Sequence, residues 1–225
     1  MERCALLSCG LACCFVSLVF CLVGRHPVAM NYLAHFHIAR ETQTSLVGAM
    51  LGDFVKGSRY KEYASDLQTA IRLHRRIDAY TEDSPLIRDA KKMFDPKLRR
   101  FAGIALDVFW DHCLAKNFAA YDAVPLADFV HEIYGALQAD TQADNPHFER
   151  VSYFMMTYDW LNNYAHVDGL TRALQGLSRR RPALAPVADC IPGLASHGPA
   201  LEKMFGEFYP HLVVQSREWV AAGFA

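Results

Sequence analysis

The stretch KLRRFAGIALDVFWDHCLAKNF, residues 97–118, is the longest amphipathic run in the chain and predicts a helix. Apolar side chains recur from Leu98 to Phe109 at intervals of three and four residues, the spacing that gathers them on one helical face. Asp107 and Asp111 lie on or beside that face, one turn apart. Two carboxylates at this spacing repel each other unless a cation or a proton lies between them. The run therefore predicts a core helix with a charged site on its apolar side.

Similar helical patterns continue on both sides of this run, with almost no alternating strand pattern from residue 31 onward. Thr44 is the expected cap of the first of these helices and Gly57 its stop. A stretch rich in proline and glycine, residues 182–198, separates the last two. The further helices are expected at residues 44–57, 66–82, 85–94, 125–139, 147–163, 167–179 and 199–222. We therefore predict an all-α fold, a single-domain bundle of about eight helices.

Length and composition exclude several classes of protein. The chain has 225 residues, enough for one domain with a substantial core. With 52% apolar and 21% charged residues, it fits neither a disordered chain nor a polytopic membrane protein. The formal net charge of −1 gives no overall attraction to nucleic acid, so we expect no nucleic-acid partner.

Cysteines are concentrated at the start of the chain. Only Cys113 and Cys190 lie beyond the first 21 residues, whereas a disulfide scaffold would spread its cysteines through the folded body. We therefore expect a reduced, cytoplasmic domain.

The first 29 residues form an apolar leader, separate from the domain expected at residues 30–225. Residues 5–24 carry no charge and are numerous enough to cross a bilayer or to form a signal-peptide core. Met30, however, opens MNYLAHFHIA and resembles a natural start. The favoured interpretation is a misplaced start codon, and the alternatives are an inner-membrane anchor and a cleaved signal. A membrane partner is expected only if the leader exists and is retained.

Polar side chains occur on the apolar sides of other predicted helices as well. In AIRLHRRIDAY, residues 70–80, His74 and Asp78 are four residues apart and share one helical face. Asp53 follows the apolar stretch MLG. His35 and His37 flank Phe36, and at most one of them is expected to join a given site.

Together these groups favour a metal site. Each one alone has a plainer explanation: Asp53 as a solvated or capping residue, and His74 with Asp78 as a surface pair. Acid or imidazole on the apolar sides of three helices is costly, however, and one divalent cation would compensate for all of it. Histidine and aspartate together suit Mn²⁺, Mg²⁺, Fe²⁺ or Zn²⁺, and the body lacks the cysteine pairs of a structural zinc site. Metal-dependent hydrolysis is the first interpretation of these residues.

Several longer motifs carry a family likeness. MNYLAHFHIA, SLVGAMLGDFVKG, IRLHRRIDAYTEDSP, RRFAGIALDVFWDHCLAKNF and GLSRRRP, in this order and spacing, resemble the acyl carrier protein phosphodiesterase family. The likeness extends from Met30 to about Glu218. It implies an all-α fold distantly akin to HD-type metal phosphohydrolases. It also implies Mn²⁺-dependent hydrolysis, with Mg²⁺ and Fe²⁺ as alternative ions, that removes 4′-phosphopantetheine from the serine of acyl carrier protein.

The resemblance also implies site residues, although the chain lacks the adjacent His-Asp pair of HD proteins, which leaves each ligand's identity open. The expected metal ligands are Asp53, His74, Asp78 and Asp107. The expected catalytic residues are Asp53, Asp111, His112 and His35, of which His112 or His35 would protonate the leaving oxygen.

Acyl carrier proteins resemble one another in being acidic, so a basic docking surface is expected. Arg75 and Arg76 adjoin His74 and are the favoured substrate-binding residues, and Lys56 could steady phosphate charge. Other basic groups are Lys91 with Lys92, and the arginine-rich stretches at residues 97–100 and 179–181; each has a solvated helix face as its plain alternative.

Two rival functions remain open at this stage. One keeps the metal site but acts on a nucleotide or another small phosphodiester. The other is a non-enzymatic helical module that binds carrier protein and holds its acids in a structural network.

Overall fold

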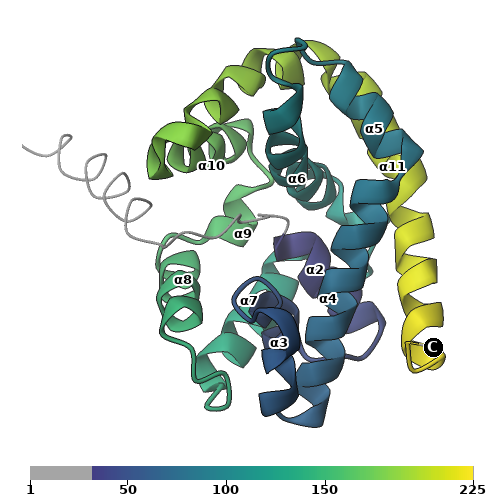
Figure 1. The fold of residues 1–225 in the computed structure, drawn as a ribbon, viewed down its shortest axis with the longest axis vertical. Coiled ribbons are helices and arrows are strands. Elements are labelled where there is room, and N and C mark those ends of the chain that lie inside the picture. The colour runs from purple at the N-terminus through teal and green to yellow at the C-terminus, as the bar shows by residue number, and fades with distance from the viewer. Residues whose placement is uncertain (1–31, 225) are drawn as a thin grey trace, which may run out of the picture.

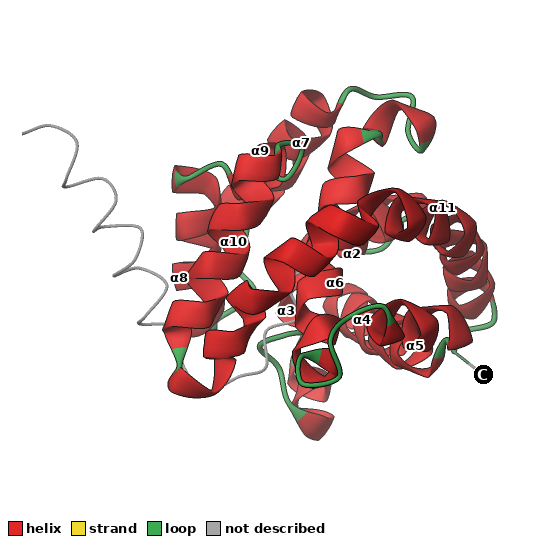
Figure 2. Cartoon of the chain, turned by 90° about the horizontal axis from the view of Figure 1, so that it is seen from above, coloured by secondary structure: helices red, strands yellow, loops and turns green. Residues whose placement is uncertain are grey.

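The computed structural model describes residues 32–224, and every regular element in that range is a helix (Figures 1 and 2). The α-helices are α2 (Tyr32–Glu41), α3 (Leu46–Leu51), α4 (Ser65–Asp83), α5 (Pro85–Lys92), α6 (Arg99–Lys116), α7 (Leu126–Ala139), α8 (Pro146–Thr157), α9 (Trp160–Asn163), α10 (Val167–Arg180) and α11 (Ile191–Ala221). Three 3₁₀-helices join them: η1 (Gly57–Glu62), η2 (Phe118–Ala120) and η3 (Pro182–Cys190). The prediction of an all-α, single-domain fold is confirmed.

The described residues hold more helices than the eight predicted. One reason is α2, which the pattern analysis did not count separately. The other is the predicted helix at 147–163, which divides into α8 and α9. Asp159, between them, has a left-handed backbone with φ of 47°, a conformation that cannot continue a right-handed helix.

The apolar leader lies outside the described residues. Its three interpretations, a misplaced start, an anchor at residues 5–24 and a cleaved signal, therefore stay predictions. Within residues 32–224, no helix has the length and apolar character needed to cross a membrane.

Helix α6 is the central element of the fold (Figure 1). It contacts α2, α5, α10, α11 and η3, which surround it. All eight residues from Val108 to Ala115 are buried, so the helix is covered on every side at this level. The prediction of an amphipathic helix with one apolar face is wrong here, because neighbouring helices cover the polar side as well.

Two predicted boundaries also need correction. The stretch 182–198 is not a simple separator, because η3 and the first turns of α11 occupy it. Val187, Cys190 and Leu194 are buried there, and this packing outweighs the helix-breaking tendency of the nearby prolines. At 44–57, the cap is Ser45 and the helix ends at Leu51. The Ser45 side chain accepts a hydrogen bond from Gly48 N, and an irregular turn follows.

Four segments meet around the site. Helix α3 packs against α2 and α4, α4 continues to α5, and both α2 and α5 pack on α6. The turn after α3 therefore faces the C-terminal half of α4, with α5 and the N-terminal half of α6 closing the other sides.

Candidate metal centre

A cavity of about 330 Å³ lies where the turn after α3, α4, α5 and α6 meet. It is open to solvent, and its walls carry charged groups of both signs together with a few apolar side chains. Three of the four predicted metal ligands line it, namely Asp53, Asp78 and Asp107. The other lining residues are Thr81, Glu82, Ile87, Lys91, Arg100, Gly103 and Ile104.

Two stacked imidazole rings lie behind this cavity. His35 from α2 and His74 from α4 have ring centroids 3.8 Å apart and ring planes only 12° apart. Both side chains are 2% exposed. Their Nε2 atoms meet the same carboxylate, His35 at 3.1 Å from Asp78 Oδ1 and His74 at 3.2 Å from Asp78 Oδ2. The i,i+4 spacing of His74 and Asp78 on α4 produces half of this arrangement, and α2 supplies the rest.

One hydrogen bond fixes the orientation of His74. Its Nδ1–H donates to Ala49 O at 2.6 Å, so the Nε2 atom is left to face the carboxylates. Asp53 Oδ1 lies 3.5 Å from this Nε2 atom, and Asp78 lies still closer. A neutral imidazole would direct its lone pair at these oxygens, so either a proton or a cation must lie between them. A metal-binding histidine commonly donates the N–H of its other ring nitrogen to a backbone carbonyl, which fixes the orientation of the ring.

Gly52 makes room for the His74 ring. A Cβ at position 52 would lie 2.2 Å from His74 Cγ and 2.4 Å from Cδ2, too close for any side chain. The glycine therefore lets α3 approach α4 until the imidazole touches its backbone. Because Asp53 follows directly, the same contact brings this carboxylate to the ring.

In the metal-free protein, the site holds a proton on His74. Burial lowers the pKa of His74, but the Asp78 and Asp53 carboxylates outweigh this effect and raise it to about 10. Burial raises the pKa of Asp78, yet the positive charge on His74 and the hydrogen bond with His35 hold it well below its usual range. Burial, and then the charge on His74, lowers the pKa of His35. Only one of the two stacked rings is thus protonated.

Asp107 differs from the other acids of the cavity. Burial is the main reason that its pKa rises to about 7, and the charges of Asp78 and Asp53 add to the effect. Lys91 opposes the shift. Asp107 is therefore a carboxyl group that exchanges its proton near neutral pH in the metal-free protein.

The groups at this site fit a divalent cation. His35, His74 and Asp78 each offer one ligand atom, and these atoms lie within 4.8 Å of one another. Two buried polar atoms that face each other at this site have no hydrogen-bond partner among the described residues: His74 Nε2 and Asp53 Oδ2. Such atoms are costly unless a ligand satisfies them. Two imidazoles with carboxylates form a donor set that suits Mn²⁺, Fe²⁺ or Zn²⁺.

Asp111 lies elsewhere and caps a helix. It is fully buried, and its carboxylate accepts hydrogen bonds from the backbone of Leu33 and Ala34, both at 3.0 Å. These amides belong to the first turn of α2, where unpaired N–H groups attract a carboxylate. Burial nonetheless raises the pKa of Asp111 well above its usual value. The structure does not bring Asp111 into the cavity with Asp107, because backbone amides hold it.

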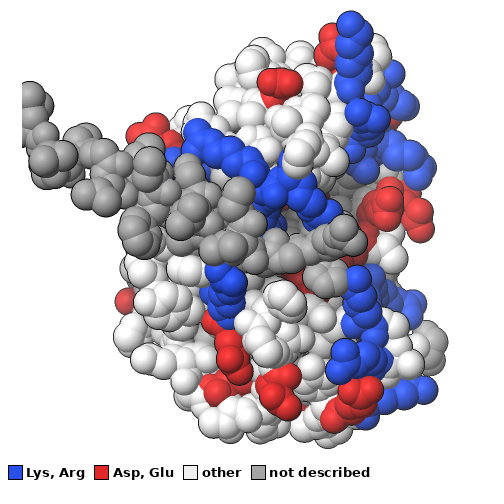
Figure 3. Space-filling model, turned by 60° about the vertical axis from the view of Figure 1, so that its left-hand side comes forward, with Lys and Arg blue, Asp and Glu red and all other residues white. Residues whose placement is uncertain are grey.

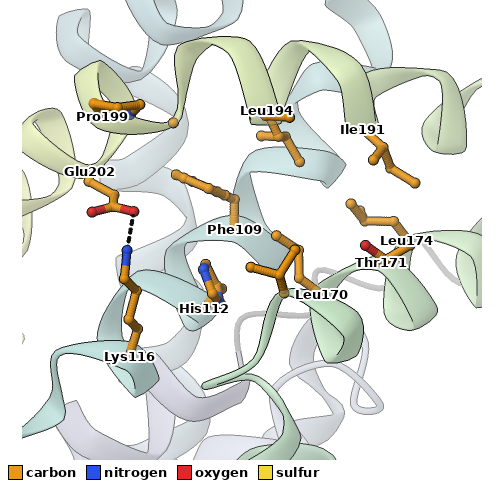
Figure 4. A pocket seen from close by; sticks show the side chains of 13 residues that line it. Phe109, His112, Lys116, Leu170, Thr171, Leu174, Ile191, Leu194, Pro199 and Glu202 are labelled. Atoms are coloured by element: carbon orange, nitrogen blue, oxygen red, sulfur yellow. Dashed lines mark hydrogen bonds and ion pairs between the residues drawn. The ribbon is translucent and has the colours of Figure 1, made fainter.

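His112 also faces away from the cluster, into a second pocket of about 230 Å³ between α6, α10 and α11 (Figure 4). Its Nδ1 atom lies 2.7 Å from Tyr164 O. The walls are mostly apolar, and an ion pair of Lys116 with Glu202 (2.7 Å) stands at one side. The structure therefore separates His112 from Asp78 and gives it no contact with the acids of the cavity.

The predicted substrate-binding residues are held by other contacts. The Arg75 guanidinium donates to Val55 O (2.6 Å) and Gly57 O (2.7 Å), and so fastens the turn after α3. Arg76 lies over the Trp219 ring at 5.0 Å. Lys56 is exposed in the same turn. The basic side chains that line the cavity itself are instead Lys91 and Arg100.

A second histidine cluster, on the opposite side of α2, is a structural network. His37 Nδ1 lies 2.7 Å from Tyr209 Oη, and His37 Nε2 lies 3.7 Å from Asp122. Glu41 completes the group. Arginines already neutralise both carboxylates, Arg40 at Asp122 (3.1 Å) and Arg217 at Glu41. Of the two histidines that flank Phe36, only His35 reaches the cavity cluster.

Comparison with known proteins identifies the family of the chain. The model of the family described as acyl carrier protein phosphodiesterase matches residues 30–212. The chain belongs to this family. Relatives named acyl carrier protein phosphodiesterase include proteins of Enterobacter sp. (strain 638), Yersinia enterocolitica and Escherichia coli K12, with identities of 37%, 34% and 35%. The alignments cover 84%, 84% and 83% of this chain and 98%, 98% and 97% of the relatives.

No solved structure matches the chain. The kinship with HD-type phosphohydrolases therefore stays a prediction. Membership of the acyl carrier protein phosphodiesterase family, which the motifs predicted, is confirmed.

Two parts of the site were not apparent from the sequence. His35 was expected to be catalytic and not a metal ligand, because nothing in the pattern links α2 to α4. Lys91 and Arg100 were expected only as members of basic groups. The spacing of Arg100, Gly103 and Asp107, at three and four residues, was a usable signal, since it puts all three on one face of α6.

Proposed function

We propose that the protein is a metal-dependent phosphodiesterase that removes 4′-phosphopantetheine from the serine of holo acyl carrier protein. The observation that supports this most strongly is the stacked pair of His35 and His74, whose Nε2 atoms converge on Asp78 beside an open cavity. The family and the names of the relatives supply the substrate class.

The cation is held, in this proposal, by His35, His74 and Asp78, with Asp53 as a fourth ligand. We propose Mn²⁺, with Mg²⁺ and Fe²⁺ as the alternatives; two imidazoles favour the transition-metal ions over Mg²⁺. A cation bound there would polarise the phosphoryl group and lower the pKa of a bound water toward neutral pH. Ala49 O, through its bond to His74 Nδ1, keeps one ligand ring in its binding orientation.

Asp107 is the proposed proton carrier. Its pKa of about 7 suits a group that accepts or donates a proton at neutral pH, and it lines the same cavity as Asp53 and Asp78. Asp107 therefore takes the part expected of His112, which lies in the other pocket, and of His35, whose Nε2 atom is directed at Asp78.

An acidic carrier protein would approach through basic groups on the surface. On the face shown in Figure 3, Lys and Arg side chains gather in several groups, with Asp and Glu side chains beside some of them. A net charge of −1 thus permits a locally basic docking surface. The proposal includes a cytoplasmic location, which the free, buried Cys113 and Cys190 support.

The proposal is tested by the mass of the carrier protein. Purified enzyme, stripped of metal by a chelator, is mixed with holo acyl carrier protein, with and without Mn²⁺, Mg²⁺ or Fe²⁺. We expect the carrier to lose the mass of 4′-phosphopantetheine only when a divalent ion is present.

Two results would each favour one of the rival functions instead. Cleavage of nucleotides or of small 4′-phosphopantetheine esters, with the carrier protein left intact, would favour a small-substrate hydrolase. A protein that binds the carrier but leaves its mass unchanged with every ion would favour the binding module.

A further inference from the structure

Two basic side chains line the same cavity as the acids of the metal centre. Lys91 comes from α5 and Arg100 from the first turn of α6, and Asp53, Asp78 and Asp107 share the cavity with them. A site built only of carboxylates would repel a phosphodiester, which is itself an anion. The cations on the cavity wall are therefore the groups to consider for the substrate.

Lys91 reaches its position because α6 carries a glycine there. A Cβ at Gly103 would lie 3.1 Å from Lys91 Cε and 3.4 Å from Lys91 Nζ. The end of the lysine side chain thus lies across Gly103, where any other residue would crowd it. Asp107 is one helical turn after Gly103 on the same face of α6. The Lys91 ammonium group therefore lies on the side of α6 that carries this acid.

The Lys91 ammonium group has room for a ligand. Among the described residues, no hydrogen bond or ion pair within 4.0 Å involves it. The next residue, Lys92, is different: its Nζ atom pairs with Asp89 Oδ1 at 2.7 Å. Lys91 is near enough to Asp107 to oppose the rise of that residue's pKa, yet it is not paired with it. A half-buried lysine without a partner, next to a cavity, is a ready site for an anion.

Arg100 supplies charge at the rim. It is exposed, and its guanidinium lies 4.6 Å from the centre of the Phe101 ring. This stacking directs the side chain along the surface of α6. Arg100 is therefore placed to attract an anion, and Lys91 to hold it.

We propose that Lys91, lying across Gly103, binds a phosphoryl oxygen of the substrate and so holds the phosphodiester against the metal centre. This inference rests on the proposed function, because it presupposes a phosphodiester in the cavity. It assigns to Lys91 the contact with phosphate that the sequence suggested for Lys56, which is exposed in the turn after α3.

A structural explanation competes with this one. Lys91 could serve only to balance the charge of the three acids, without touching the substrate. In that case the removal of Lys91 would alter metal affinity and stability. Its effect on the binding of a ligand would be the same whether or not the ligand carries a phosphate. The two explanations therefore differ in whether the effect depends on a phosphate group.

The experiment compares Lys91→Met with Lys92→Met, a neighbouring lysine that is paired with Asp89. For each variant we would measure kcat and KM on holo acyl carrier protein, the Kd of Mn²⁺ for the free enzyme, and the Kd of two probes. The probes are 4′-phosphopantetheine and pantetheine, which differ by the phosphate alone. Lys91→Arg, which keeps the positive charge, tests rescue.

For Lys91→Met we expect kcat/KM to fall at least tenfold and 4′-phosphopantetheine to bind at least tenfold more weakly. Pantetheine binding and the Kd of Mn²⁺ should change less than threefold. Lys92→Met should bind both probes as the wild type does, and Lys91→Arg should recover part of the loss. A Lys91→Met enzyme that binds 4′-phosphopantetheine as the wild type does would overturn the inference, and so would a loss confined to Mn²⁺ affinity.

Gly103→Ala provides a second variant that does not remove the lysine. Alanine favours a helix over glycine, so the thermal midpoint should stay equal or rise once the flexible lysine moves aside. The displaced ammonium should nevertheless weaken 4′-phosphopantetheine binding several-fold. Unchanged binding in this variant would count against the position assigned to Lys91.

The proposed function and this inference can fail separately. If the wild-type enzyme leaves holo carrier intact with every ion, the proposed function fails, while the two probes still compare the wild type with Lys91→Met. If the wild type cleaves the carrier and Lys91→Met does so equally well, the function stands and the inference fails.

Discussion

His74 is the residue on which the proposed site depends most. Ala49 O binds one side of its ring, the His35 ring covers one face, and Asp53 with Asp78 faces the remaining nitrogen. Each contact comes from a different segment. The i,i+4 spacing was enough to predict that His74 and Asp78 share a site, but the stacked partner is 39 positions away and depends on tertiary packing alone.

Asp111 shows where reasoning from single residues was incomplete. Two carboxylates one turn apart were expected to need a cation or a proton between them, but backbone amides can also bind a carboxylate. Asp107 turns to the cavity, whereas Asp111 turns to the first turn of α2. No pattern in the sequence indicates that the start of one helix will meet the middle of another 77 positions later.

Asp111 should make stability depend on pH. Its folded-state pKa is raised by burial, so between about pH 4 and that value the folded protein holds a proton that the unfolded chain has lost. Its contribution to the free energy of unfolding therefore falls as pH rises, by up to about 1.4 kcal/mol per pH unit. Asp111→Asn does not titrate, so the advantage of the wild type over this variant should shrink as pH rises from 4 to 8.

Urea unfolding of both proteins at several pH values measures this difference. An advantage of the wild type that grew with pH would mean that the folded protein holds Asp111 ionised.

At the scale of elements, the contact between α3 and α4 sets the geometry of the site. The helix patterns predicted both elements, but α3 proved shorter than expected, and Asp53 lies in the turn after it. The reason for the glycine in LGDF was not visible in the sequence. It became clear only with the His74 ring against Gly52.

Gly52→Ala should therefore disturb the metal centre from a neighbouring helix. The added Cβ would lie 2.2 Å from His74 Cγ, so the ring or the helix must move. We expect Mn²⁺ to bind at least tenfold more weakly and the thermal midpoint to fall. The matched control is Gly135→Ala on α7, where an added Cβ meets nothing within 4 Å and should be neutral or stabilising by about 0.5–1 kcal/mol. Equal Mn²⁺ affinity in both variants would contradict this account of Gly52.

Arg75 also acts between elements, because its side chain holds the turn between α3 and η1. Arg75→Ala removes two hydrogen bonds from a charged donor to Val55 O and Gly57 O, so we expect a loss of about 1–3 kcal/mol in the free energy of unfolding. Arg76→Ala removes only an exposed stacking contact on Trp219 and should cost less. If Arg75→Ala kept full stability and raised only the KM for carrier protein, the docking role expected from the sequence would be correct.

At the scale of the whole molecule, composition and helical periodicity were sufficient to predict the fold class. They could not predict that residues 108–115 of α6 are enclosed on all sides, because the covering partners, such as α10 and α11, come from distant parts of the chain. They also could not show that the basic residues of the cavity are Lys91 and Arg100, since charge runs look alike before the fold positions them.

The charges of the whole surface matter for the binding of the carrier protein. If an acidic partner is attracted by groups of Lys and Arg, the KM for holo carrier should rise several-fold between about 50 and 300 mM salt, because screening shortens the reach of these charges. Binding of the small product 4′-phosphopantetheine, which touches only the cavity, should change less. A KM that is independent of salt would show that docking does not use these charges.

The most direct test of the central claim is a titration of metal-free protein with Mn²⁺, comparing the wild type with His74→Gln and His112→Gln. The account predicts that the wild type and His112→Gln bind one ion with similar affinity. His74→Gln should bind at least a hundredfold more weakly. Wild-type affinity in His74→Gln, or a loss in His112→Gln instead, would contradict a metal centre built on the stacked pair of His35 and His74.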